Sequence, residues 1–247
     1  MSRMLRALGV VAILSVICGL LAAGSAVAAD PDPMAGAPEV GACYDLTIKQ
    51  AYEFASPEAP VECATRHTVV VTAVGTLPSS LDWATIDRSH LPAALSAAVT
   101  KTCDPSVATL VGAPTRRALS LYTGYWFAPT DADVAAGARW FSCELALAET
   151  TRLVPLSAGQ PSKVGRPVAK KVGRCGDARG NYVLCSRTHR WRATFATTVD
   201  AKPSGKRIAA AAVRICPRHV RSRTWRYGAP IQERTSFVLT CLTKTRH

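Results

Sequence analysis

The first thirty residues combine a short basic start with a long apolar stretch. Arg3 and Arg6 precede residues 7–29, which carry no charge and end in the small residues Ala26-Val27-Ala28. A basic start, an apolar stretch and an A-x-A-like end are typical of an export signal, so residues 1–29 are predicted to be one, cleaved after Ala28 or Ala29. Two alternatives remain open, a retained membrane anchor and lipidation of Cys18. All three place the rest of the chain outside the cytoplasm.

Further along the chain, short apolar segments predict strands and helices. Residues 68–74 and 191–197 are rich in β-branched and aromatic residues, which favours strands. Residues 91–99 are alanine-rich with a proline in the first turn, which predicts a helix. Residues 138–148 and 235–242 are predicted to form closing strands. We therefore expect an α+β fold of two small domains, each a short antiparallel sheet with one packed helix.

The same motifs occur twice in the same order, which indicates a tandem repeat. Val40–Asp45 and Val172–Asp177 share the pattern V-G-x-C-x-D, and C-x-x-x-H begins at Cys63 and again at Cys185. Each half continues with a strand-like run, an alanine-rich segment that ends in cysteine, and a tryptophan 16 or 17 residues before its last cysteine. The repeat-matched residues, to which we assign structural roles, are His67 with His189 and Trp126 with Trp225.

The segment between the repeats separates two predicted domains. Residues 151–171 are rich in Pro, Gly, Ser and basic residues and have no hydrophobic period, as is typical of an extended linker. This places a first domain at residues 38–150 and a second at residues 172–247.

Eight of the nine cysteines follow the apolar N-terminal stretch. An even number of cysteines in an exported chain indicates disulfides, which supplement the limited core of small domains. Because each half carries four cysteines, we expect one pairing pattern used twice, first with second and third with fourth. The predicted bridges are Cys43–Cys63, Cys103–Cys143, Cys175–Cys185 and Cys216–Cys241.

Charge divides the chain sharply. Residues 30–150 hold 7 basic and 14 acidic residues, for a net charge of −7, whereas residues 151–247 hold 21 and 3, for a net charge of +18. The basic half is predicted to contact an anionic wall polymer or membrane surface. Alternatives are attraction between the halves, a merely solvated basic face, and nucleic acid, against which export argues. The candidate anion-binding residues are Arg187, Arg190, Arg192, Arg218, Arg221, Arg223 and Arg226.

The histidines are the main candidates for chemistry. Zinc sites need four ligands, and disulfide-bonded cysteines cannot supply thiolates, so we predict no metal and no cofactor. His67 and His189 are therefore interpreted as imidazoles fixed beside a disulfide. Asp131 and Asp133 are interpreted as part of a solvated turn, and no nucleophile motif is present. We predict a non-enzymatic protein, with an exported hydrolase that uses His67 or His189 as the alternative.

These motifs resemble the septum formation domain, a family of exported or membrane-anchored actinobacterial proteins. The first half carries the clearest resemblance, in Val40–Asp45, Cys63–Pro78, Cys103 and Gly137–Cys143. The second half keeps the cysteines and the histidine but has a shorter first loop, like a diverged copy. The resemblance implies an extracytoplasmic interaction role in cell division or the envelope. An adaptor for division proteins is a further alternative, and no catalytic residue carries over.

Overall fold

The computed structural model describes residues 31–56, 58–156 and 161–245. Pro31–His247 forms one compact unit. The predicted export signal at residues 1–29, including Cys18, lies outside the described residues. Within the described part of the chain, no helix has the length and apolar character needed to cross a membrane.

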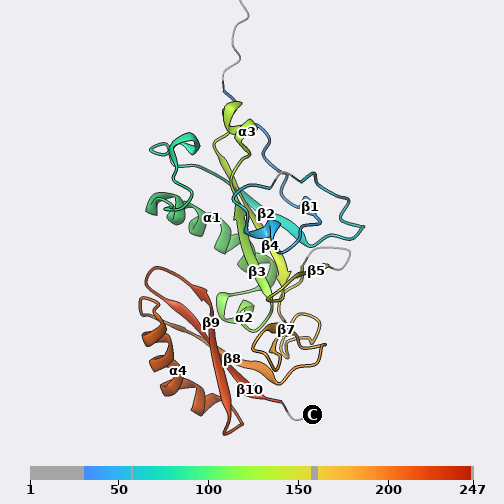
Figure 1. Cartoon of the computed structure of the whole chain (residues 1–247), viewed down its shortest axis with the longest axis vertical. Coiled ribbons are helices and arrows are strands. Elements are labelled where there is room, and N and C mark those ends of the chain that lie inside the picture. The colour runs from blue at the N-terminus through green and yellow to red at the C-terminus, as the bar shows by residue number, and fades with distance from the viewer. Residues whose placement is uncertain (1–30, 57, 157–160, 246–247) are drawn as a thin grey trace, which may run out of the picture. The chain divides into compact units, whose positions relative to one another are not determined.

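The first half contains a five-stranded antiparallel sheet (Figure 1). Its strand order is β1-β2-β4-β3, with β5 also paired to β4. The strands are β1 (Cys43–Tyr44), β2 (Val69–Thr76), β3 (Tyr122–Phe127), β4 (Trp140–Ala148) and β5 (Leu153–Val154). The helices are α1 (Ala93–Val111), α2 (Pro114–Arg117) and α3 (Asp131–Ala135), with short 3-10 turns η1 (Gln50–Tyr52) and η2 (Trp83–Thr85). Helix α1 packs against β2, β4 and β3.

The second half contains another five-stranded antiparallel sheet, with the order β7-β6-β8-β10-β9. Its elements are β6 (Arg174–Gly176), β7 (Tyr182–Leu184), β8 (Trp191–Val199), α4 (Gly205–His219), β9 (Trp225–Gln232) and β10 (Phe237–Lys244). Helix α4 packs against β8, β9 and β10. Four strands are arranged alike in the two sheets. They lie side by side as β1-β2-β4-β3 in the first half and as β6-β8-β10-β9 in the second, so in each half the last two exchange places relative to their order along the chain. The fold is α+β, as predicted.

Helix α1 is longer than the sequence suggested, because packing extends it well beyond residue 99. Leu95, Cys103, Val107 and Val111 are buried at spacings of four and eight residues, so they share one face of the helix. Burial of this face offsets the cost of Pro105, which lies inside the helix and lacks the amide proton for a helical hydrogen bond. The predicted strands at 68–74, 138–148, 191–197 and 235–242 match β2, β4, β8 and β10 to within a few residues.

Four disulfides link the cysteines in the pairs that the sequence predicted. In each half, one bridge ties the first strand to the segment that follows it, and another ties the long helix to a central strand of the sheet, α1 to β4 and α4 to β10. The bridges are Cys43–Cys63, Cys103–Cys143, Cys175–Cys185 and Cys216–Cys241. Such bridges are typical of proteins that fold outside the cytoplasm.

Hydrogen bonds and shared apolar packing join the two halves. The amide of Leu121 donates to the carbonyl oxygen of Val172 at 2.8 Å. Val164, within the predicted linker, and Leu184 on β7 pack into the same buried cluster as Val111 on α1. The two sheets therefore share part of their hydrophobic core.

Glu149 lies at this junction, just after β4, and its side chain is only 2 % exposed. One carboxylate oxygen accepts from Arg187 at 2.6 Å and from Arg152 at 2.8 Å, and the other accepts from the amide of Leu184 at 3.0 Å. Burial favours the protonated acid, but these donors outweigh burial and lower the pKa of Glu149. The carboxylate thus joins the end of the first sheet to the start of the second.

Replacing Glu149 with glutamine is expected to lower the free energy of unfolding by about 2–3 kcal/mol at pH 7, because charge-assisted hydrogen bonds are lost. The pKa of this carboxyl group is lower in the folded state than in the unfolded state. Its ionised form therefore stabilises the protein at pH values above the unfolded-state pKa, and this stabilisation is lost as the pH falls through the folded-state pKa. The difference should therefore shrink at pH 3. Urea denaturation at both pH values measures it, with Glu53→Gln at an exposed site as the control. An equal effect of both variants would contradict the role given to Glu149.

Candidate functional site

Four of the seven predicted anion-binding arginines are exposed, and within the described structure their side chains make neither an ion pair nor a cation–π contact. Arg218 lies in the last turn of α4, and Arg221 and Arg223 follow in the segment that leads to β9. Arg190 is exposed immediately before β8. The first three therefore form one short basic segment, whereas Arg190 lies on a different part of the second half.

The other three arginines make contacts that stabilise the fold. Arg187 forms the ion pair with Glu149. The guanidinium of Arg192 donates to the carbonyl oxygen of Val168 at 2.9 Å, and that of Arg226 lies 4.8 Å from the ring centroid of Trp191. The structure thus separates the predicted set into side chains available to a partner and side chains already engaged within the protein.

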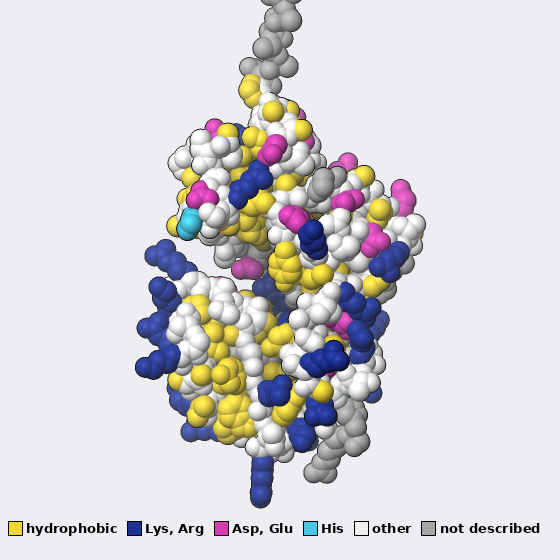
Figure 2. All heavy atoms as spheres, in the orientation of Figure 1, with side chains coloured by type: hydrophobic (Ala, Val, Ile, Leu, Met, Phe, Trp, Pro, Cys, Tyr) yellow, Lys and Arg dark blue, Asp and Glu magenta, His cyan; other side chains and the backbone are white. Residues whose placement is uncertain are grey.

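Helix α4 adds Arg207 and Arg214, which the sequence-based prediction did not include, to the predicted Arg218. Arg207, Arg214 and Arg218 are all exposed, and their spacings of seven and four residues place them along one stripe of the helix. The opposite face buries Ile208 and Cys216 against the sheet. In Figure 2, Lys and Arg side chains gather over the half that contains α4, and most Asp and Glu side chains in view lie over the half that contains α1. The spacing of these arginines at near multiples of the helical period could have revealed this stripe from the sequence.

The two repeat-matched histidines make the same local contact. Nδ1 of His67 lies 3.0 Å from the carbonyl oxygen of Thr65, and Nδ1 of His189 lies 2.7 Å from that of Arg187. His67 is 1 % exposed. Each imidazole therefore contacts the backbone two residues earlier, which fits a role in fixing the loop before a strand. Among the described residues, no group of three His, Cys, Asp or Glu side chains is placed to hold a metal ion.

The two tryptophans occupy different positions in their sheets. Trp126 on β3 lies opposite Cys143, whereas Tyr227 on β9 lies opposite Cys241 and Trp225 lies opposite Thr243. Counting along the sequence thus pairs Trp126 with Trp225, while strand register pairs it with Tyr227. Trp225 still packs against the core cluster under α4.

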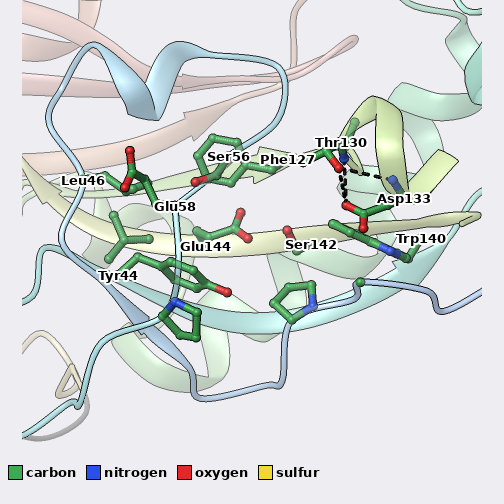
Figure 3. A pocket seen from close by; sticks show the side chains of 15 residues that line it. Tyr44, Leu46, Ser56, Glu58, Phe127, Thr130, Asp133, Trp140, Ser142 and Glu144 are labelled. Carbon is green, nitrogen blue, oxygen red and sulfur yellow. Dashed lines mark hydrogen bonds between the residues drawn. The ribbon is translucent and has the colours of Figure 1, made fainter. Parts of the chain in front are cut away.

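A cavity of about 300 Å³ lies against the first sheet and contains a buried acid (Figure 3). Ser142 and Glu144 point into it from β4, on the face opposite Cys143 and Leu145, because side chains alternate along a strand. Figure 3 shows Tyr44 and Ser56 on either side of the Glu144 carboxyl group. The lining residues are Gly36, Pro38, Tyr44, Leu46, Ser56, Glu58, Pro60, Val69, Phe127, Ala128, Thr130, Asp133, Trp140, Ser142 and Glu144.

Glu144 is buried without a charged partner. The residue is 2 % exposed, and its Oε2 atom has no hydrogen-bond partner. Burial raises the pKa of Glu144 to about 8, and a hydrogen bond with Ser142 opposes only part of this shift. Burial, and then the nearby Glu144 charge, raise the pKa of Tyr44 as well. The cavity therefore contains a carboxyl group that is largely protonated at neutral pH.

Of the two aspartates expected in a solvated turn, Asp133 caps helix α3. The hydroxyl of Thr130 accepts from the amide of Asp133 at 3.2 Å, and the Asp133 carboxylate accepts from the Thr130 amide at 3.1 Å. This reciprocal arrangement is a capping box. Asp131 is exposed and pairs with Arg88 at 2.6 Å.

Comparison with known proteins identifies the family. A family model described as septum formation matches residues 40–225, which is most of the chain. The chain belongs to the septum formation family. No curated protein and no solved structure matches it.

In this septum formation protein, the matched segment spans all of the first half and most of the second, but not the last cysteine, Cys241. It begins at Val40, three residues before β1, and ends at Trp225, the first residue of β9. The family description supports a role in septum formation and names a cellular process rather than a reaction. The four disulfides are consistent with an extracytoplasmic environment for the protein.

Glu144 is the residue of interest that the sequence-based prediction did not include. It interrupts the apolar run of β4, Trp140–Ala148, in which most residues are buried. An acidic residue at an inward position of a buried strand is unusual, because desolvation disfavours its charged form. An acidic residue inside an otherwise apolar strand was thus the feature of the sequence that could have identified Glu144.

Proposed function

We propose that this protein is a non-catalytic, exported component of septum formation whose basic second half contacts anionic wall or membrane components. The observation that carries the proposal is uncompensated positive charge. Residues 151–247 have a net charge of +18. Among the described residues 172–245, Arg187 is the only lysine or arginine whose side chain forms an ion pair.

The exposed side of α4 and the segment after it are the proposed contact surface. This surface consists of Arg207, Arg214, Arg218, Arg221 and Arg223. Several cations held on one side of a folded unit attract a polyanion or an anionic lipid surface more strongly than scattered charges do. Guanidinium groups also bind phosphate and carboxylate in a bidentate geometry.

The non-catalytic part of the proposal is supported by the surroundings of the histidines. His67 is buried and contacts a backbone carbonyl, and neither His67 nor His189 lines the cavity around Glu144. A general base must lie within hydrogen-bonding reach of its substrate. The family description likewise names no reaction.

The double variant Arg214→Gln/Arg218→Gln is expected to weaken binding about 10- to 30-fold, because a basic residue near an anionic lipid surface contributes about 1 kcal/mol. Cosedimentation measures binding to purified wall material and, separately, to vesicles that contain anionic lipid, at low and at physiological salt. Binding should also weaken as salt rises, since screening shortens the range of the attraction.

The matched control is Lys49→Gln/Lys101→Gln, which removes two exposed positive charges from the first half. It should leave binding nearly unchanged. Binding of neither material at low salt would overturn the proposal, and an equal loss in both double variants would overturn the assignment to α4. The two materials distinguish a wall polymer from a lipid surface as the partner.

A further inference from the structure

The cavity around Glu144 is independent of the basic surface, and its interior leaves two polar atoms unsatisfied. Oε2 of Glu144 and Oγ of Ser56 are both buried without a hydrogen-bond partner, and both residues line the cavity. Buried polar groups in proteins nearly always have partners, because an orphaned group costs about 1–3 kcal/mol. Both atoms therefore lack partners among the described residues, and a water molecule or a ligand in the cavity can supply them.

The charge of the lining selects the sign of that ligand. Glu58, Asp133 and Glu144 line the cavity, and none of the described lining residues is Lys, Arg or His. An anionic group would meet no cationic side chain among the described lining residues, and the carboxylates of Glu58 and Asp133 would repel it. A cation would instead meet the Glu144 carboxylate together with the hydroxyl oxygens of Ser56 and Ser142.

The walls of the cavity select the rest of the ligand. Leu46, Val69 and Phe127 contribute apolar surface, and the aromatic ring of Tyr44 lies beside the carboxyl group (Figure 3). Aromatic faces attract cations, and apolar walls favour a hydrocarbon chain. The volume of about 300 Å³ accommodates a small group rather than a folded domain.

We propose that this cavity binds a primary ammonium group carried on a short aliphatic chain, with Glu144 as its counter-ion. The three N–H donors of the ammonium match the three kinds of acceptor in the cavity, a carboxylate, a phenol and two serine hydroxyls. The ligand class is thus an alkylamine or an amino side chain that enters from outside the protein.

Binding moves a proton in a defined direction. Because the pKa of free Glu144 is raised to about 8, most molecules hold a proton there at pH 7. The ammonium pairs with the carboxylate, so the Glu144 proton is released to solvent when the ligand binds. Among the described residues, the other titratable groups on this side of the sheet include Tyr44 on β1, Tyr125 on β3 with Tyr52 packed against it, Glu58 before β2 and Asp133 on α3. Burial raises the pKa of Tyr125 as well as that of Tyr44, so neither of these two supplies a charge at pH 7.

The test is a titration of the oxidised full-length protein with n-butylammonium, followed by two-dimensional ¹H–¹⁵N NMR. Amides of β1 and β4 beside the cavity should shift, and n-butanol of the same length should bind at least tenfold more weakly. Affinity should rise about tenfold per pH unit between pH 6 and 7.5, because the ionised fraction of Glu144 rises tenfold per unit there. Calorimetry in two buffers of different ionisation enthalpy should show release of nearly one proton at pH 7.

The Glu144→Gln variant should lose at least tenfold in affinity and should release no proton. Its matched control, Glu53→Gln, changes an exposed acid that does not line the cavity and should leave the affinity within threefold of the wild-type value. The comparison of butylammonium with butanol and the proton count use the unaltered protein, so a folding defect in the variant does not remove the test. Equal affinity for the two ligands, no binding of either, or unchanged affinity in Glu144→Gln would overturn the proposal.

Discussion

The Glu144→Gln variant is expected to gain stability over the wild-type protein as the pH rises from about 4.5 to about 8. The unfolded carboxyl ionises near 4.5, whereas burial raises the folded pKa to about 8. Between these values the unfolded state holds fewer protons than the folded state, so wild-type stability falls as the pH rises. The fall should be on the order of 5 kcal/mol, and glutamine, which does not ionise, should lack it.

Denaturant unfolding at pH 4, 6, 8 and 9 measures this difference. At each pH, the free energy of unfolding of the wild type is subtracted from that of the variant, and the change of this difference with pH is the result. The glutamine amide adds a contribution of its own, but this contribution does not depend on pH. Glu53→Gln, at an exposed position, provides the baseline for an ordinary carboxylate. A difference between Glu144→Gln and wild type that stays constant across the range would show that Glu144 ionises normally in the folded protein.

Removal of the Cys103–Cys143 bridge should destabilise the protein most among the four disulfides. The bridge closes the longest loop, with a sequence separation of 40, and the chain-entropy estimate for that length is about 4 kcal/mol. Cys143 is fully buried, so Cys103→Ala/Cys143→Ala also leaves a small cavity between α1 and β4. Such a loss is a large fraction of the stability of a typical domain.

The corresponding double variant of the shortest bridge, Cys175→Ala/Cys185→Ala, is the comparison. Its separation of 10 residues predicts a smaller loss of about 3 kcal/mol. Thermal unfolding of both variants under oxidising conditions ranks them. A larger loss for the Cys175–Cys185 pair would mean that packing around β6 and β7, rather than loop length, decides the contribution of each bridge.

The sequence predicted the parts of the fold that depend on local pattern and on repetition. Runs of β-branched and aromatic residues located β2 and β8, and the repeated cysteine order reduced many pairings to one. Strands β3 and β9 were not predicted, since Tyr122–Phe127 and Trp225–Gln232 contain glycine, and β9 also contains proline, within otherwise strand-like segments. These edge strands pair only with β4 and β10, and those tertiary contacts override weak local propensity.

The cavity around Glu144 could not be predicted because its parts come from distant segments. The pairing of β1, β2 and β4 brings Tyr44 and Glu144 to one face, and the bridge between Ala55 and Ala128 places Ser56 beside them. The basic segment after α4, in contrast, was visible in the sequence as a run of arginines. What the sequence did not reveal was which arginines, such as Arg187 and Arg226, are engaged within the protein.

The shared cluster of Val111, Val164 and Leu184 bears on how this protein can be dissected. A fragment that contained only one sheet would expose these buried apolar side chains to water and would be prone to aggregate. Because the two sheets share this cluster, we expect both to unfold together in a single cooperative transition. A force applied to either sheet would consequently be transmitted to both.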